Sequence, residues 1–260
     1  MKRGYIDTEF GQIHYKMAGD RGPYVFLFHE SPVSSWEFDP AIPYLATRCR
    51  AVAFDNPGYG QSDAPADPID MAGFAARFWV AIDQFGVDRF AIGAVHTGSS
   101  IALELITKHL GDRVTHAVLS GIPMIRPDQV DAFKARIGLP EMDADGEFLK
   151  RLWQARRKSW GEATNLDMIR EAVAQQLMIY PRFHWAFHAV FGYDAAAALK
   201  QLRCPVYVIN AEGDSLAEVD RQAAALIKGA KFKLIPGVKG QLPYRAPEVY
   251  ARELLGFIGA

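Results

Sequence analysis

The sequence predicts an α/β fold in which a mostly parallel central sheet is flanked by helices. Short, continuous apolar runs rich in β-branched and aromatic residues alternate with segments whose apolar residues recur at helical spacing. Strands buried on both faces of a parallel sheet give runs of the first kind, and helices covering the sheet give segments of the second. The functional site is expected in loops at the carboxyl ends of these strands.

Six apolar runs are predicted as strands. In chain order they are residues 24–29, 50–55, 89–94, 116–121, 205–210 and 231–236. The segments between them carry apolar residues on one helical face: Phe74, Phe78, Ile82 and Phe85, then Ile101 and Leu105, and finally Tyr250, Leu254 and Phe257. Regular alternation of strand and helix is the pattern that builds an α/β sheet.

One region, from about Pro123 to Leu199, interrupts the alternation. It contains four helical stretches, residues 128–138, 146–161, 167–180 and 182–193, and no strand pattern. We therefore predict an inserted helical cap over residues 123–199, lying above the strand-end loops. The core then comprises residues 1–122 and 200–260. The alternative is that these helices form an ordinary layer of the core.

Charge and composition exclude several classes of partner. The chain has 29 Lys and Arg against 30 Asp and Glu, with no basic stripe or acidic tail, so neither nucleic acid nor a membrane is an expected partner. No apolar stretch is long enough to span a bilayer and no secretory signal is apparent, so a cytoplasmic location is expected. A small molecule is the expected ligand. The oligomeric state stays open, with a homodimer among the alternatives.

Five segments, in order along the chain, carry a resemblance to a known family. They are HESP (29–32), DNPGYGQSD (55–63), GAVHTGSS (93–100), INAEGDSLAE (209–218) and PGVKGQLPYRAPE (236–248). Together they resemble the capped group of the α/β-hydrolase fold superfamily. The resemblance implies that fold, a hydrolase-type site at the strand ends and no cofactor.

The residues at the implied catalytic positions differ from the family pattern. His96 stands where the nucleophile is expected, and Gln241 stands where the catalytic histidine is expected. Only Asp214 matches the usual acid. A serine triad needs a hydroxyl and a base to take its proton, and an amide accepts no proton at neutral pH. The pattern therefore excludes a standard serine-esterase mechanism.

A shifted alignment would restore a hydroxyl but fits the local pattern less well. Ser99 or Ser100 could then occupy the turn. However, Gly98 matches the small residue that this turn requires behind its apex, and the following helix keeps its apolar face in phase only with His96 at the apex. We therefore keep the alignment with His96.

Two interpretations of His96 remain open. In the first, its ring points into a covered pocket and acts with Asp214 as a general base, while Gln241 binds substrate or orients the ring. In the second, the triad has been lost. Histidine then only tolerates a turn with positive φ, and the protein binds a ligand without turnover.

The segment after residue 28 is predicted to contribute the oxyanion site. Backbone N–H groups of Ser31 and Thr97 are the expected donors, while Glu30 replaces a glycine of the pattern. Glu30 has three alternative roles: a second acid or base, an ion pair with Lys239 or Arg245, or a side chain turned to solvent.

Other aromatic and histidine side chains have weaker signals. Trp36 and Tyr244 are predicted to contribute to substrate binding. His184 and His188 share one helical face, which we interpret as a pocket-lining or core face rather than a metal site. No metal is predicted, and the two cysteines, Cys49 and Cys204, lack a metal-ligand or disulfide pattern.

The predicted function is that of an enzyme acting on a small, fairly apolar carbonyl compound. Hydrolysis of an ester or lactone is the family-level expectation, and proton transfer of the lyase or isomerase type gains weight because the serine is missing. The alternative is a catalytically silent small-molecule-binding protein of the same fold.

Overall fold

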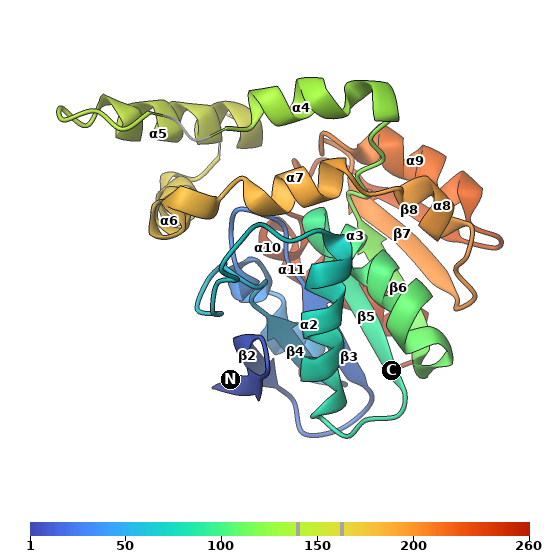
Figure 1. The fold of residues 1–260 in the computed structure, drawn as a ribbon. Coiled ribbons are helices and arrows are strands. Elements are labelled where there is room, and N and C mark those ends of the chain that lie inside the picture. The colour runs from blue at the N-terminus through green and yellow to red at the C-terminus, as the bar shows by residue number, and fades with distance from the viewer. Residues whose placement is uncertain (139–140, 162–163) are drawn as a thin grey trace.

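The computed structural model describes residues 1–138, 141–161 and 164–260. Within them the strands form an eight-stranded sheet of order β1-β2-β4-β3-β5-β6-β7-β8 (Figure 1). The strands are β1 Lys2–Thr8, β2 Gly11–Ala18, β3 Tyr24–Phe28, β4 Arg50–Phe54, β5 Phe90–Val95, β6 Val114–Ser120, β7 Val206–Ala211 and β8 Lys231–Ile235. Strands β3 to β8 pair in parallel, whereas β1 and β2 pair antiparallel. The predicted α/β fold is confirmed.

The helices cover both faces and the carboxyl edge of this sheet. The α-helices are α1 Ile42–Leu45, α2 Met71–Asp83, α3 Thr97–Leu105, α4 Val130–Arg136, α5 Glu147–Trp160, α6 Leu166–Met178, α7 Trp185–Phe191, α8 Ala195–Leu199, α9 Ala217–Leu226, α10 Leu242–Arg245 and α11 Pro247–Ile258. Shorter 3₁₀ or π segments are η1 Ser35–Phe38, η2 Ile106–Leu110, η3 Gly111–Arg113, η4 Pro127–Gln129 and η5 Tyr180–Arg182.

Alternate residues of the strands face opposite sides of the sheet, as the pleat requires. In β3, Phe26 and Phe28 join the apolar cluster that contains α2 and α3. Val25 and Leu27 join the cluster that contains α1 and α11. The sheet is therefore buried on both faces, which explains why its central strands appear in the sequence as continuous apolar runs.

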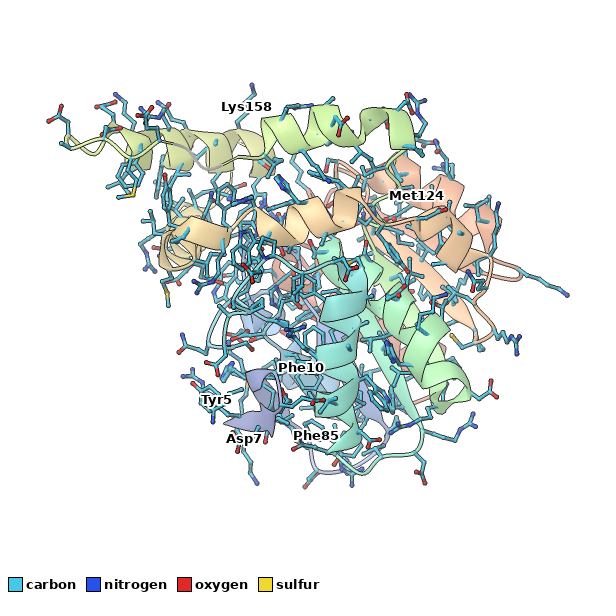
Figure 2. The ribbon with its side chains drawn as sticks, in the orientation of Figure 1. Tyr5, Asp7, Phe10, Phe85, Met124 and Lys158 are labelled. Atoms are coloured by element: carbon cyan, nitrogen blue, oxygen red, sulfur yellow. The ribbon has the colours of Figure 1, made fainter. Side chains whose placement is uncertain are left out.

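The hairpin of β1 and β2 was not among the predicted strands. Its residues pair from Lys2–Met17 to Thr8–Gly11, and only a few, such as Ile6 and Ile13, are buried apolar residues. Figure 2 shows Tyr5 and Asp7 at this edge of the molecule. A hairpin with one exposed face gives a mixed polar pattern, which lacks the signal of a buried strand.

The segment between β6 and β7 is helical, and its helices pack in two ways. Helices α5 and α6 share an apolar cluster with Val33, distinct from the two clusters on the faces of the sheet. Apolar residues of α7 and α8 instead join the cluster that contains α2 and α3. Figure 1 shows α4 and α5 in the layer farthest from the sheet. The division into a core and a cap of residues 123–199 stays a prediction. No helix in the described residues is long and apolar enough to cross a membrane.

Candidate active site

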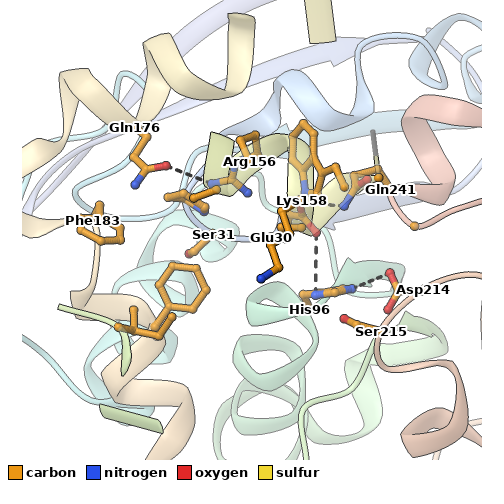
Figure 3. A pocket seen from close by; sticks show the side chains of 18 of the residues that line it. Glu30, Ser31, His96, Arg156, Lys158, Gln176, Phe183, Asp214, Ser215 and Gln241 are labelled. Atoms are coloured by element: carbon orange, nitrogen blue, oxygen red, sulfur yellow. Dashed lines mark hydrogen bonds and ion pairs between the residues drawn. The ribbon is translucent and has the colours of Figure 1, made fainter. Parts of the chain in front are cut away.

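Four loops at the carboxyl ends of parallel strands bring the predicted residues together. Glu30 follows β3, His96 follows β5, Asp214 follows β7, and Gln241 follows β8. All four line one cavity of about 620 Å³, which α5 and α6 cover with Arg156 and Gln176 among other residues (Figure 3). The cavity lies where ligands bind in open α/β sheets.

His96 occupies the turn between β5 and α3 with φ 47° and ψ −112°. Gly98 lets α3 approach β3, because a Cβ at this position would overlap the carbonyl oxygen of Phe28. The two serines of the alternative alignment are fully buried in α3, and neither lines a cavity around His96. The His96 side chain is 21% exposed and faces the cavity.

The imidazole of His96 lies between two carboxyl groups. Its Nε2 is 3.0 Å from Asp214 Oδ2, within hydrogen-bond distance, and its Nδ1 is 3.8 Å from Glu30 Oε2. Burial alone lowers the pKa of His96, but the Asp214 carboxylate, together with the charges of Glu30 and Glu37, more than offsets this effect and the pKa rises to about 10. Burial likewise raises the pKa of Asp214, but the positive charge of His96 outweighs it and holds that pKa at about 2. His96 is therefore an imidazolium at neutral pH.

Buried neighbours fix the backbone of Glu30. Its N–H donates to Glu37 Oε2 at 2.9 Å, and its carbonyl oxygen accepts from His29 Nδ1 at 2.6 Å. Burial lowers the pKa of His29 to about 4, so the ring is neutral and its Nε2 accepts the N–H of Asn56. Burial also raises the pKa of Glu30, an effect that the charge of His96 only partly offsets. Glu37 has its pKa raised further, by burial and by the Glu30 carboxylate beside it.

Gln241 connects Glu30 to the helices above the cavity. Its Nε2 donates to Glu30 Oε1 at 3.3 Å, and its Oε1 accepts from Arg245 Nε at 3.2 Å. Arg245 also donates to the carbonyl of Trp160 at the end of α5. Of the three roles weighed for Glu30, exposure to solvent is wrong, because the residue is 3% exposed. Across the described ranges Glu30 forms no ion pair with Lys239 or Arg245.

The remaining predicted residues divide into two groups. Ser31 and Thr97 both lie beside His96 in the wall of an adjoining cavity of about 310 Å³. Trp36 and Tyr244 instead pack on each other, with ring centroids 4.3 Å apart, and they do not line either cavity at His96. Tyr244 lines a further cavity of about 660 Å³ that shares Trp160, Gly161 and Lys239 with the cavity of about 620 Å³, so substrate binding by these two aromatic rings stays a prediction.

The helical segment supplies cavity residues that the motifs did not reveal. Arg156 on α5 and Gln176 on α6 form a hydrogen bond of 3.0 Å, and both line the cavity. Their only sequence signal was the amphipathic spacing of the helices. The ring centroids of His184 and His188 are 5.0 Å apart. Within residues 1–138, 141–161 and 164–260, no group of three or more His, Cys, Asp or Glu residues could hold a metal ion.

Comparison with known proteins agrees with this fold. A family model described as "Alpha/beta hydrolase family" matches residues 25–253, so the chain belongs to the α/β-hydrolase family. A non-heme chloroperoxidase of Streptomyces lividans is 26% identical and covers 98% of this chain and 99% of its own length. The structure of an enol-lactonase from Burkholderia xenovorans LB400 matches with a TM-score of 0.84 at 17% identity, covering 99% of this chain and all of its own. A bromoperoxidase from Bacillus anthracis matches with a TM-score of 0.85 at 16% identity over the full length of both chains. These two structures are similar in fold.

Proposed function

We propose that this protein is an enzyme that moves a proton on a small carbonyl compound without forming a covalent acyl intermediate. In this proposal Glu30 is the base that takes the proton, and His96 is a cationic hydrogen-bond donor. This revises the role of general base that we expected for His96. The observation that carries the proposal is the position of the His96 ring at the strand–helix turn, with Nε2 3.0 Å from Asp214 Oδ2 and Nδ1 3.8 Å from Glu30 Oε2 in the cavity wall.

The electrostatics of the site favour this division of roles. An imidazolium paired with Asp214 is a poor base, because its proton is held up to a pKa of about 10. The raised pKa of Glu30 brings its carboxyl nearer to the neutral range, in which one group can both take and return a proton. Gln241 donates its hydrogen bond to Oε1 of Glu30, so Oε2 remains available to take the proton of the substrate.

The reaction begins with a carbonyl oxygen bound to His96 Nδ1–H and an adjacent C–H directed at Glu30 Oε2. Glu30 takes the proton, the electron pair of the C–H bond forms a carbon–carbon double bond, and the π pair of the carbonyl moves to its oxygen to give an enolate. The positive charge of His96 stabilises the enolate oxygen. In a substrate with a β,γ double bond, return of the proton from Glu30 to the γ-carbon gives isomerisation, while a β-leaving group that departs with its bonding pair gives elimination.

The test is exchange of α-hydrogens in D₂O, followed by NMR, for a panel of small ketones, keto esters and lactones. We expect at least one compound to exchange faster with the wild type than with buffer. Glu30→Gln should reduce the enzymatic rate by at least about 100-fold, the scale of a lost general base. Glu218→Gln, which changes an exposed carboxylate of α9 in the same way, should leave the rate unchanged.

The pH dependence of the rate distinguishes Glu30 as the base from the expectation, based on the sequence, that His96 is the base. With Glu30 as base and His96 as cation, the rate should rise through the raised pKa of Glu30 and fall near pH 10. A base at His96 would instead give a rate that rises only near pH 10, where the ring loses its proton. Covalent labelling of a serine by a fluorophosphonate would contradict the proposal, because it would reveal a nucleophile that the mechanism lacks.

A binding protein without turnover is the second candidate. The observation that favours it is the network that fixes the polar groups, since Gln241 contacts both Glu30 and Arg245. In that case the compounds of the panel would bind without exchange. The Glu30→Gln variant would then change affinity alone.

A further inference from the structure

The cavity at His96 is lined by basic side chains that the proposed reaction does not use. Four basic side chains, Arg136, Arg156, Lys158 and Lys239, contribute to its wall, whereas its carboxylates are Glu30 and Asp214. Asp214 is already paired with His96 at 3.0 Å. In the part of the chain that the structure describes, none of the four cations forms an ion pair within 4.0 Å. The cavity therefore has unneutralised positive charge.

Arg156 is the cation that the fold fixes most firmly. It shares one face of α5 with Leu152, Ala155, Ser159 and Trp160, the spacing that turns these side chains toward the cavity. Its guanidinium lies 4.8 Å from the ring centroid of Trp160 and donates through one terminal nitrogen to Gln176 at 3.0 Å.

The terminal nitrogens of Arg156 offer donors to a ligand. In the described residues Nη2 donates to Gln176, whereas Nη1 forms no hydrogen bond, and the residue lines the cavity. The Nε atom is buried without a partner and does not face the cavity space. A carboxylate would accept hydrogen bonds from the two terminal nitrogens together, the geometry of a bidentate ion pair.

A second, apolar chamber opens on the other side of His96. It has a volume of about 310 Å³, and its apolar wall includes Ile125, Phe133, Val190 and Phe191. This is about twice the size of a cavity that accepts benzene. His96, Ser31 and Ser215 line both spaces, so the two chambers meet at the imidazole, and Arg136 is a cation that also lines both.

We infer that the substrate is a small carboxylate with an apolar tail: its carboxylate binds Arg156, its tail fills the chamber around Phe133, and its reacting carbonyl lies between them at His96. The inference rests on the proposed function for the position of the reacting group. It extends the sequence prediction of a fairly apolar compound by adding a charged end. The guanidinium at one end and the apolar chamber at the other also determine the orientation in which the substrate binds.

Calorimetric titration with non-reacting probes tests this assignment. The probes are 4-phenylbutyrate, the neutral amide 4-phenylbutanamide, butyrate and phenyl phosphate. We expect the wild type to bind 4-phenylbutyrate at least about tenfold more tightly than the amide, since a charged hydrogen-bonded partner is lost. Arg156→Met should remove about 10–100-fold of the affinity for 4-phenylbutyrate and leave that for the amide unchanged.

Two further variants complete the design. Arg151→Met removes the same charge from the same helix, but this residue is exposed and pairs with Asp143, so affinity should not change. Phe133→Ala should weaken the binding of 4-phenylbutyrate by about fivefold or more. It should leave the affinity for butyrate unchanged, because butyrate lacks the ring. Circular dichroism melting curves confirm that each variant is folded.

The assignment is overturned if the amide binds as tightly as the carboxylate, or if Arg156→Met and Arg151→Met have equal effects. Tighter binding of phenyl phosphate than of 4-phenylbutyrate would overturn the choice of a carboxylate. These titrations need no turnover, so they are independent of the exchange assay. Exchange that depends on Glu30, together with no preference for the carboxylate, would leave the proposed function standing and remove this inference alone.

Discussion

His96 and Gln241 hold a backbone conformation that few side chains adopt. In the described residues they are the two non-glycine positions with positive φ, at 47° and 40°. Such a conformation costs on the order of 1–3 kcal/mol and persists where the surrounding structure enforces it. Both side chains converge on Glu30, with Gln241 at 3.3 Å and His96 at 3.8 Å. The strain is therefore concentrated at the proposed proton-transfer group.

Asp214→Asn tests the protonation of His96. Asparagine keeps the shape of the side chain but removes the charge that raises the pKa of His96 to about 10. We expect the His96 pKa to fall by at least about two units, because burial then dominates. NMR titration of the imidazole carbon-bound protons measures this change. Asp112→Asn, on the surface in η3, is the control, and an unchanged His96 titration in Asp214→Asn would refute the charge assignment.

The sequence could predict where these residues lie, but not their ionisation. Motif order placed Glu30, His96, Asp214 and Gln241 at the ends of four strands, and parallel strands present such ends at one edge of a sheet. The pKa of His96, however, depends on a separation of 3.0 Å between groups 118 residues apart in the sequence. Arg156 carried no motif, because its role depends on which face of α5 meets the cavity.

At the scale of elements, one tyrosine connects the turn after β4 to α7. Tyr59 Oη donates to the carbonyl of Phe183 at 3.0 Å and accepts the N–H of Ala186 at 3.0 Å. Arg182 Nε donates to the carbonyl of Gly58 at 3.0 Å in the same region. These bonds hold η5, Phe183 and α7 against the strand-end loops, which places Phe183 and, from α7, Phe187 in the cavity wall.

Tyr59→Phe should loosen α7 without disturbing the sheet. The change leaves the Ala186 N–H and the Phe183 carbonyl without their partner, at a cost of about 1–3 kcal/mol. We expect faster hydrogen exchange in residues 183–191 and unchanged exchange in β5 and β6, measured by mass spectrometry. Tyr44→Phe, on an exposed tyrosine of α1, is the control. Equal acceleration in the sheet would show that the hydroxyl stabilises the whole fold rather than this helix.

The elements themselves differed in how well the sequence predicted them. The six predicted strands begin and end within two residues of β3 to β8. Burial on both faces gives the central strands a continuous apolar run, whereas β8 at the edge of the sheet is only partly buried. The β1–β2 hairpin exposes one face and escaped detection. The sequence also gave no sign that α7 and α8 join the main apolar cluster while α5 and α6 form their own, since this depends on packing in space.

At the scale of the whole molecule, the buried ionisable groups oppose one another across the pH range. Asp214 and Asp55 have pKa values of about 2 in the folded state, so their stabilisation is present above their ordinary pKa of 3.8 and is lost as pH falls toward 2. His29, with its pKa lowered to about 4, also favours unfolding as pH falls below 6.5. These three groups destabilise the fold in acid, whereas the raised pKa values of the buried acids Glu30, Glu37 and Asp220, the last at about 6, favour the folded state as pH falls.

The alkaline side of this stability curve isolates the His96–Asp214 pair. The folded pKa of His96 is about 10, above its ordinary 6.5, so its stabilisation is complete below pH 6.5 and disappears as pH rises to 10. Cys49 and Cys204 have pKa values of about 12 and 11 in the folded state, so they also lower the stability of the fold as pH rises. Their contribution is the same in the wild type and in any His96 variant. The informative quantity is therefore a difference between two proteins.

We expect the melting temperature of the wild type to exceed that of Asp214→Asn at pH 7 and the gap to close by pH 10. The pair contributes on the order of a few kcal/mol at neutral pH, and each kcal/mol corresponds to about 2–4 °C for a chain of this size. Both proteins keep the cysteines, whose contribution cancels in the comparison. A gap that stayed constant from pH 7 to pH 10 would mean that His96 is neutral in the folded protein. The cationic donor on which the proposed chemistry depends would then be absent.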